Sequence, residues 1–164
     1  MSSDEPPSPG QPPSPGQPPI RRLEGDPPSP WEGVFGYSRA VVAGPWVLIG
    51  GTTSVDPSGC VVGTTPYEQT IEILRKLVHE LSRVGFGPED VVMTRMYVTD
   101  ISRSDEVGRA HGELFGSVGV GGPGAPGGAG GPGGVGGPVS TMVEVSGLID
   151  PRMLVEIELM AYRA

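Results

Sequence analysis

Alternating apolar and polar residues mark two strands near the end of the chain. Residues 153–160 alternate aliphatic side chains with two carboxylates, Glu156 and Glu158, so a strand would present them on opposite faces. Residues 138–145 show the same parity, and the Gly- and Pro-containing link at 146–151 predicts a turn that places the two strands side by side. We therefore expect a sheet with one face for helices and one for a site or a subunit interface.

The clearest helix signal lies in the middle of the chain. Thr65 and Glu68 form a capping box around a proline, and apolar residues then recur at three- and four-residue spacing until two glycines end the pattern. A second helix is expected from Ser102 or Ser104 to about Phe115, although two internal glycines weaken it.

Further apolar runs predict the remaining strands. Residues 34–43 and 46–53 flank a Gly-Pro pair and predict a hairpin, with a short strand following around residues 61–62. Residues 90–100 predict another strand. The order strand, strand, helix, strand, helix, strand, strand indicates an α+β domain.

Composition adds two segments for which no packed structure is expected. Residues 1–30 are rich in proline with a repeated Pro-Ser-Pro-Gly-Gln-Pro unit, and residues 117–137 are mostly glycine and proline. Such segments bury too little apolar surface to offset their ordering entropy. We expect a disordered tail at 1–30 and a compact domain at 31–164 that carries a flexible insert at 117–137. The tail contains PxxP spacings, so a domain that recognises proline-rich segments stays an alternative partner for it.

Charge and cysteine content narrow the function classes. The net charge of −8, with a single lysine, disfavours binding to a nucleic-acid backbone. Cys60 alone forms neither an internal disulfide nor a CxxC zinc site, and His79 and His111, expected on helix surfaces, lack metal-binding spacing. The sequence contains no apolar run of membrane-spanning length and no secretory signal. We expect a cytoplasmic protein without metal, cofactor or membrane contact.

Five fragments in this order resemble the Rid (YjgF/YER057c/UK114) family of reactive-intermediate deaminases. They are Tyr37-Ser38-Arg39-Ala40, residues 47–52, residues 93–100, Val143-Glu144-Val145 and Val155-Glu156-Ile157-Glu158. The resemblance implies a chorismate-mutase-like α+β fold, with a six-stranded, mostly antiparallel sheet and two helices on one face. It further implies a homotrimer with one ligand pocket at each subunit interface. Deaminating members hydrolyse 2-imino or enamine acids to 2-oxo acids and ammonia.

Ser140 stands where the resemblance implies an arginine that clamps the substrate carboxylate. The family stretch Pro-Ala-Arg-Ser/Thr corresponds here to Pro138-Val139-Ser140-Thr141. Losing a charge-assisted clamp would remove about 1.5 to 3 kcal/mol of binding free energy. Gly50, Thr52 and Gly108 also differ, since the family has Ser, Gln and Asn at these positions. We therefore do not expect standard 2-imino acid deamination.

The resemblance leaves Glu156 and Tyr37 as candidate catalytic residues, with Glu156 at the position of the water-positioning glutamate. The candidate substrate-binding residues are Ser140, Thr141, Thr52, Gly50, Gly108 and Arg95. Each has a structural alternative: Tyr37 can be a packed ring, and alternating glutamates are common on a solvated strand. Arg39 or Arg95 could replace the missing cation, or each could be structural, Arg95 through an ion pair with Glu156 or Glu158.

Three functions stay open at this point. The first is an enzyme that handles a neutral or differently charged imine, enamine or carbonyl intermediate by acid/base catalysis. The second is a noncatalytic protein that binds or sequesters a small molecule, favoured by the small residues of the pocket. The third is a ribonuclease, an activity sometimes attached to the family, which the net charge of −8 disfavours.

Overall fold

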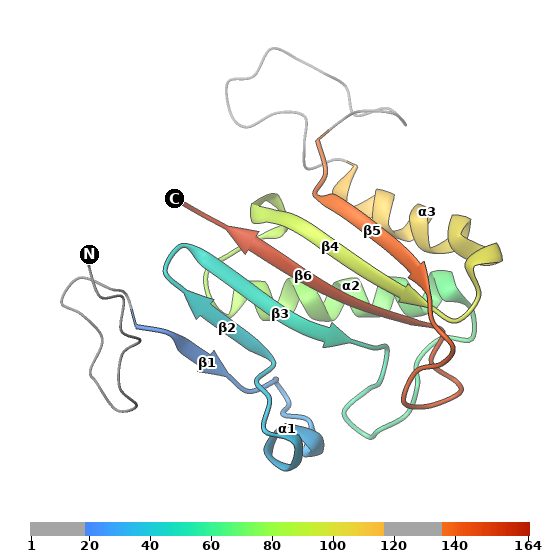
Figure 1. The fold of residues 1–164 in the computed structure, drawn as a ribbon, viewed down its shortest axis with the longest axis horizontal. Coiled ribbons are helices and arrows are strands. Elements are labelled where there is room, and N and C mark those ends of the chain that lie inside the picture. Colours follow the sequence, from blue (N-terminus) through green and yellow to red (C-terminus); the bar gives the residue numbers. More distant parts are fainter. Residues whose placement is uncertain (1–18, 117–135) are drawn as a thin grey trace, which may run out of the picture.

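The computed structural model describes residues 19–116 and 136–164. In these residues a six-stranded sheet has two long helices on one side (Figure 1). The strand order is β1-β2-β3-β6-β4-β5, and only the β4–β5 pair is parallel. The strands are β1 (Arg21–Leu23), β2 (Ala40–Ala43), β3 (Trp46–Thr52), β4 (Val91–Val98), β5 (Val139–Glu144) and β6 (Val155–Tyr162). The predicted α+β class with a mostly antiparallel sheet is confirmed.

The two long helices are α2 (Pro66–Ser82) and α3 (Ser104–Phe115). The predicted capping box starts α2: the Glu68 backbone N–H donates to the Thr65 hydroxyl (3.2 Å), and the Thr65 N–H donates to the Glu68 carboxylate (3.1 Å). A single-turn 3₁₀ helix (Ile101–Arg103), capped by Asp100, leads into α3. A second one (Pro88–Asp90) precedes β4.

The hydrophobic core lies between the sheet and the two long helices, α2 and α3. Alternate residues of each central strand point into it, as the period-two pattern predicted. Its members from the sheet and from α2 that are at most 2% exposed include Val47, Ile49, Val98, Val155, Ile157, Ile73, Leu77 and Leu81. The opposite parity of β6 places Glu156 and Glu158 on the other face, which no helix among the described residues covers.

The expected pairing of the last two strands is wrong. β4 lies between β5 and β6, so the link at 145–154 crosses the end of β4 instead of forming a hairpin turn. Backbone hydrogen bonds fix this crossing: the Val145 N–H donates to Val98 O (2.9 Å) and the Thr99 N–H donates to Leu154 O (3.1 Å). A turn-like composition is equally compatible with a short crossing, because strand order is set by pairing between distant segments.

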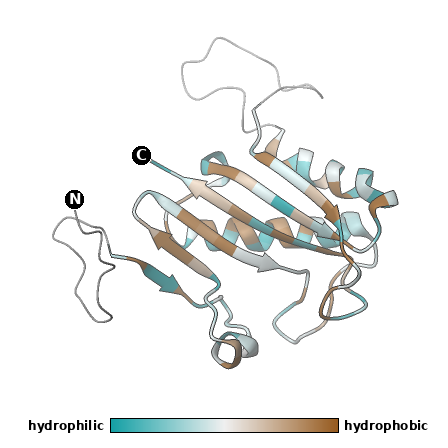
Figure 2. Cartoon of the chain, viewed as in Figure 1, coloured by the Kyte–Doolittle hydropathy of each residue, from teal (hydrophilic) through white to brown (hydrophobic). Residues whose placement is uncertain are grey.

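The sheet also begins earlier than the sequence indicated. β1 lies inside the segment expected to be disordered, and it pairs with β2. The two arginines of β1 make it a hydrophilic edge strand (Figure 2). Val34 and Phe35, expected in a strand, lie in the short helix α1 (Pro30–Phe35), because Ser29 and Glu32 form a capping box at its start. Three-residue strands bordered by prolines leave little periodicity in the sequence.

Two further expectations concern the strand around residues 61–62 and the two segments rich in proline and glycine. The strand expected around residues 61–62 is reduced to an isolated bridge between Val55 and Val61. Residues 1–18 and 117–135, which hold most of the expected tail and insert, lie outside the described residues.

Lys76, the single lysine of the chain, ties α2 to the segment after β3. Its Nζ donates to the carbonyl oxygens of Thr53 and Val55, both at 2.7 Å. Burial lowers the pKa of this ammonium group, and the nearby Arg39 lowers it further. The lysine therefore acts as a cross-brace between two segments.

The uncovered face of the sheet carries apolar side chains. We define the open face by the outward residues of β3, β6, β4 and β5, which include Trp46, Leu48, Tyr162, Met160, Tyr97 and Val143. The Trp46 and Tyr162 rings contact each other with centroids 4.8 Å apart. Trp46, Leu48, Val143 and Tyr162 are each about two-fifths exposed. Such a face marks an interaction surface.

Candidate functional site

Glu156 lies on the open face beside an irregularity in β3. The pairing of β3 with β6 shifts register between Ile49 and Thr52, and Gly51 at this bulge faces the glutamate. A Cβ atom on Gly51 would come within 1.9 Å of the Glu156 Oε1, so a larger residue would force the carboxylate to move from its present position. The bulge and the carboxylate therefore form one unit, which we call the bulge site.

The Glu156 carboxylate is half-buried and has no hydrogen bond or ion pair to any other described residue. Burial raises its pKa, Arg39 opposes the rise by favouring the charged form, and the charge on Glu158 adds to it. A general base is expected to have a raised pKa and oxygen atoms that can accept a proton, and the Glu156 carboxylate meets both conditions.

Arg39 lies at the bulge site, where it supports the backbone. Its Nη1 donates to the Gly51 carbonyl oxygen (2.7 Å) and contacts the Thr52 hydroxyl (3.5 Å), while Nη2 lies 3.7 Å from the Glu32 carboxylate. The guanidinium carbon sits 5.8 Å from the centre of the Tyr37 ring. Only 16% of the Arg39 side chain is exposed. Its guanidinium therefore stabilises the backbone of the bulge and is not free to bind a substrate carboxylate.

Among the described residues, Tyr37 and Thr52 are connected only through Arg39, and Gly50 lies within the bulged part of β3. Tyr37 is exposed and lines a small pocket of about 210 Å³ with Glu32, Ser38 and residues of β1. Thr52 is buried, and its hydroxyl donates to the Gly50 carbonyl oxygen (3.0 Å), so that hydroxyl is already occupied. Gly50 itself is exposed, and an added Cβ would meet only backbone oxygens at 3.8 Å or more.

Arg95 forms an ion pair with Glu158 across the open face. Its Nη1 donates to the Glu158 Oε1 at 2.8 Å, and the two residues are register partners on β4 and β6. This is one of the two pairings that the sequence left open. Thr141 is the register partner of Arg95 on β5 and is exposed. Since Arg95 already has a carboxylate partner, it does not supply a free cation.

Ser140 lies apart from the bulge site, on the helix side of the edge strand β5. Its hydroxyl oxygen is 3.0 Å from that of Thr94, its register partner on β4. Thr94 is fully buried, and its hydroxyl also lies 3.0 Å from Nε2 of His111 on α3. Within one chain, Ser140 and Glu156 therefore lie on opposite faces of the sheet.

The two histidines, His79 and His111, differ in how far their side chains are buried. His111 is half-buried against the Phe115 ring, with ring centroids 4.6 Å apart, so the expectation of a surface histidine is wrong. The helix pattern could not reveal this contact, because it depends on where α3 crosses β4. His79 is exposed on α2 as expected, 3.5 Å from Asp26. Gly108 is exposed on α3, with open space around an added Cβ.

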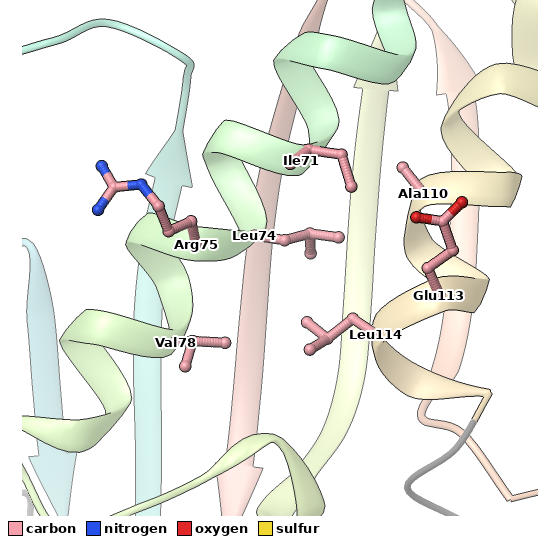
Figure 3. A pocket seen from close by; sticks show the side chains of 7 residues that line it. All are labelled: Ile71, Leu74, Arg75, Val78, Ala110, Glu113 and Leu114. Carbon is pink, nitrogen blue, oxygen red and sulfur yellow. The ribbon is translucent and has the colours of Figure 1, made fainter.

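A groove of about 370 Å³ lies between α2 and α3 (Figure 3). It is lined by Ile71, Leu74, Val78, Ala110 and Leu114, with Arg75 and Glu113. Figure 3 shows the Arg75 guanidinium pointing away from it. The groove contains none of the predicted site residues and no converging polar groups, so we place the chemistry at the bulge site and β5 instead.

Residues 19–116 and 136–164 contain no cluster of three or more His, Cys, Asp or Glu side chains suited to holding a metal ion. None of their helices has the length and apolar character needed to cross a membrane.

The fold and site together define a class of small α+β proteins with a mostly antiparallel sheet, two covering helices and an uncovered face. Comparison with known proteins extends this. The family model described as endoribonuclease L-PSP matches residues 30–163. The uncharacterized protein SCO2049 of Streptomyces coelicolor is 38% identical over 88% of this chain and 92% of its own length.

Solved structures give the same result. The chain is similar to Rv2704 of Mycobacterium tuberculosis, described as a member of the YjgF/YER057c/UK114 family, with 38% identity, a TM-score of 0.69, and coverage of 88% of this chain and 99% of that one. It is also similar to a putative endoribonuclease of Thermotoga maritima, with 26% identity, a TM-score of 0.63, and coverage of 78% and 87%. The chain belongs to the endoribonuclease L-PSP (YjgF/YER057c/UK114) family.

Proposed function

We propose that this protein binds and processes a small imine, enamine or carbonyl intermediate that lacks an α-carboxylate, in a cleft between protomers of a homotrimer. The observation that carries the proposal is the Glu156 carboxylate, which is half-buried beside Gly51 and has a raised pKa and no hydrogen-bond or ion-pair partner in residues 19–116 and 136–164. Such a group can accept a proton from water as the water attacks a C=N or C=O carbon.

The shared cleft follows from the separation of the candidate residues. Glu156, Arg39 and Tyr37 form one half-site at the β3 bulge, and Ser140 forms another at the edge strand β5. Because these half-sites lie on opposite faces of one chain, they can meet only if a second protomer contributes one of them. The apolar open face supplies a surface on which protomers can associate.

The substrate class follows from the charges available. Arg39 is held by the bulge and Arg95 by Glu158, and the Ser140 hydroxyl contacts another hydroxyl. A substrate carboxylate would therefore lack a free guanidinium at these positions, whereas a neutral group would need none.

A matched pair of cyclic imines tests this proposal. 1-Pyrroline and 1-pyrroline-2-carboxylate differ only by the carboxylate, and we expect the protein to bind the neutral compound more tightly. Ser140→Arg should reverse this preference by about tenfold or more, because it restores a charge-assisted donor. Glu156→Gln should keep binding but lose imine hydrolysis. Rapid hydrolysis of 2-iminobutyrate by the unaltered protein would contradict the proposal.

A noncatalytic binding role is the second candidate. An added Cβ would meet nothing within 4 Å at Gly108 and only backbone oxygens at 3.8 Å or more at Gly50, so both glycines leave room that larger side chains would fill. If Glu156→Gln leaves every activity on 1-pyrroline unchanged while the compound still binds, this second role is favoured. The family model's description names an endoribonuclease, but a net charge of −8 opposes binding of an RNA backbone.

A further inference from the structure

A chain of hydrogen-bonding groups runs from the exposed edge of the sheet into the protein. The exposed Ser140 hydroxyl is 3.0 Å from the Thr94 hydroxyl, which is 3.0 Å from His111 Nε2. Thr94 is completely buried, and among the described residues its hydroxyl exchanges side-chain hydrogen bonds with these two neighbours alone. The three groups come from β5, β4 and α3, and they are held in place by strand register and helix packing.

Such a chain can point in either direction. Each hydroxyl donates one hydrogen bond and accepts others, so both hydroxyls can turn together. When His111 carries a proton on Nε2, the ring donates to Thr94, Thr94 donates to Ser140, and Ser140 donates outward. When Nε2 is unprotonated, Ser140 donates inward and leaves its lone pairs facing outward.

The surroundings of His111 let its charge respond to this chain. Burial lowers the pKa of the imidazole and is the sole cause of the shift, so no charged group among the described residues fixes its state. The neighbouring charged residues of α3 are engaged with α2: the Arg109 guanidinium lies 4.2 Å from the Tyr67 ring centre, and the Tyr67 hydroxyl donates to Glu113 (2.9 Å). From the sheet, His111 meets the neutral Thr94, and within its own helix the neutral Phe115 ring.

We propose that Ser140, Thr94 and His111 form a proton relay that delivers a proton to the nitrogen of a neutral imine bound at Ser140. The inference rests on the proposed function for its ligand, and the relay itself rests on the observed contacts. In the step, His111 Nε2 gives its proton to Thr94, Thr94 gives its own to Ser140, and Ser140 gives its own to the imine nitrogen. The imine becomes an iminium ion, the histidine becomes neutral, and both hydroxyls are regenerated.

This relay assigns separate roles to the two half-sites. Protonation of nitrogen makes the imine carbon more electrophilic, and Glu156 of the other half-site can then take the proton of the attacking water. Thr94 and His111 act through Ser140 and are positioning and proton-transfer residues, and only Ser140 touches the ligand. A serine here thus does more than remove a positive charge, because it connects the ligand to a titratable group.

The first experiment follows His111 itself by NMR titration of the full-length protein without ligand. Thr94→Val removes the group that accepts from the protonated ring and should lower the pKa of His111, whereas Thr94→Ser should restore it. Ser140→Ala should move the His111 pKa in the same direction by a smaller amount. If Thr94→Val leaves the titration of His111 unchanged, the relay is overturned whether or not the proposed function holds.

The second experiment measures the ring-opening hydrolysis of 1-pyrroline against pH. We expect the unaltered protein to show a rate that rises as pH falls through the His111 pKa. Thr94→Val and Ser140→Ala should lower that limb by about a hundredfold, the size typical of general acid catalysis, while Thr94→Ser stays within a few-fold. Ser82→Ala, which removes an exposed hydroxyl at the end of α2 outside the candidate site, is the control and should keep the profile. A pH profile unaltered by Thr94→Val would refute the proposal.

Discussion

At the scale of single residues, the bulge site depends on Gly51 and Glu156 together. The Glu156 carboxylate occupies the space that a side chain on residue 51 would need, because an added Cβ would lie 1.9 Å from Oε1. The sequence predicted Glu156 from strand parity and from the family resemblance. It did not predict Gly51, because the bulge that brings the two residues together arises from the register between β3 and β6.

Replacing Gly51 by alanine should therefore displace the Glu156 carboxylate. We expect Gly51→Ala to lose imine hydrolysis and to bring the pKa of Glu156 back toward its ordinary value, since the side chain would rotate toward solvent. Carboxylate-detected NMR titration and the hydrolysis assay measure both effects. Gly112→Ala is the control: nothing lies within 4 Å of its added Cβ, so it should stabilise α3 by up to about 1 kcal/mol and keep activity.

Glu156 also links stability to pH. Its folded-state pKa is raised above 4.5 by burial, so folding favours the protonated form. The stability that this group contributes is fully present below 4.5 and is lost as pH rises through the folded-state pKa. Glu156→Gln stays neutral at every pH and should raise the melting temperature at neutral pH but have little effect in acid. Thermal melts at two pH values test this, and equal effects at both would contradict it.

At the scale of elements, local signals were sufficient for α2 and insufficient for strand order. The capping box and apolar spacing of α2 lie within a few residues, so the sequence predicted its start correctly. The neighbours of β5 and β6 depend on pairing between segments more than 40 residues apart in sequence, as for Thr94 and Ser140. The parity of β6 was nevertheless predicted correctly, because burial of one face dictates it.

Gln69 on α2 fixes the crossing link that sequence analysis misjudged. Its amide nitrogen donates to the carbonyl oxygens of Gly63 (3.1 Å) and Arg152 (2.9 Å), and its side-chain oxygen accepts from the Leu154 N–H (2.8 Å). Gln69→Leu would leave these buried groups unpaired, and we expect a loss of about 2 to 3 kcal/mol in the free energy of unfolding. Thr65→Ala, which removes only the cap of the same helix, should cost about 1 kcal/mol. Urea unfolding compares the two variants.

At the scale of the whole molecule, the sheet has helices on one side and an apolar open face on the other. The class of fold could be predicted from the order of elements and from the family resemblance. The site could be predicted only in part, because Ser140 and Glu156 separate to opposite faces of one chain. In the proposed function the two residues meet through association between copies of the protein, which a single sequence does not specify.

Association through the open face gives a prediction at this scale. Leu48→Asp places a charge among the apolar side chains of β3 and should shift the proposed trimer to monomers in sedimentation experiments. Ile71→Asp is the matched control, since Ile71 is 40% exposed against 39% for Leu48 but lies on α2, behind the sheet. If Ile71→Asp dissociates the protein and Leu48→Asp does not, the interface lies on the helix side of the sheet and the prediction is wrong. Loss of hydrolysis should accompany loss of the trimer.

The cross-brace formed by Lys76 has a practical consequence. Its amine is the only lysine amine of the chain, and in the native fold both carbonyl contacts must break before it can react freely. Acylating reagents should therefore modify residue 76 slowly in the native state and rapidly once α2 separates from the segment after β3. The extent of labelling at this residue, followed by mass spectrometry, reports how often the molecule opens at that joint.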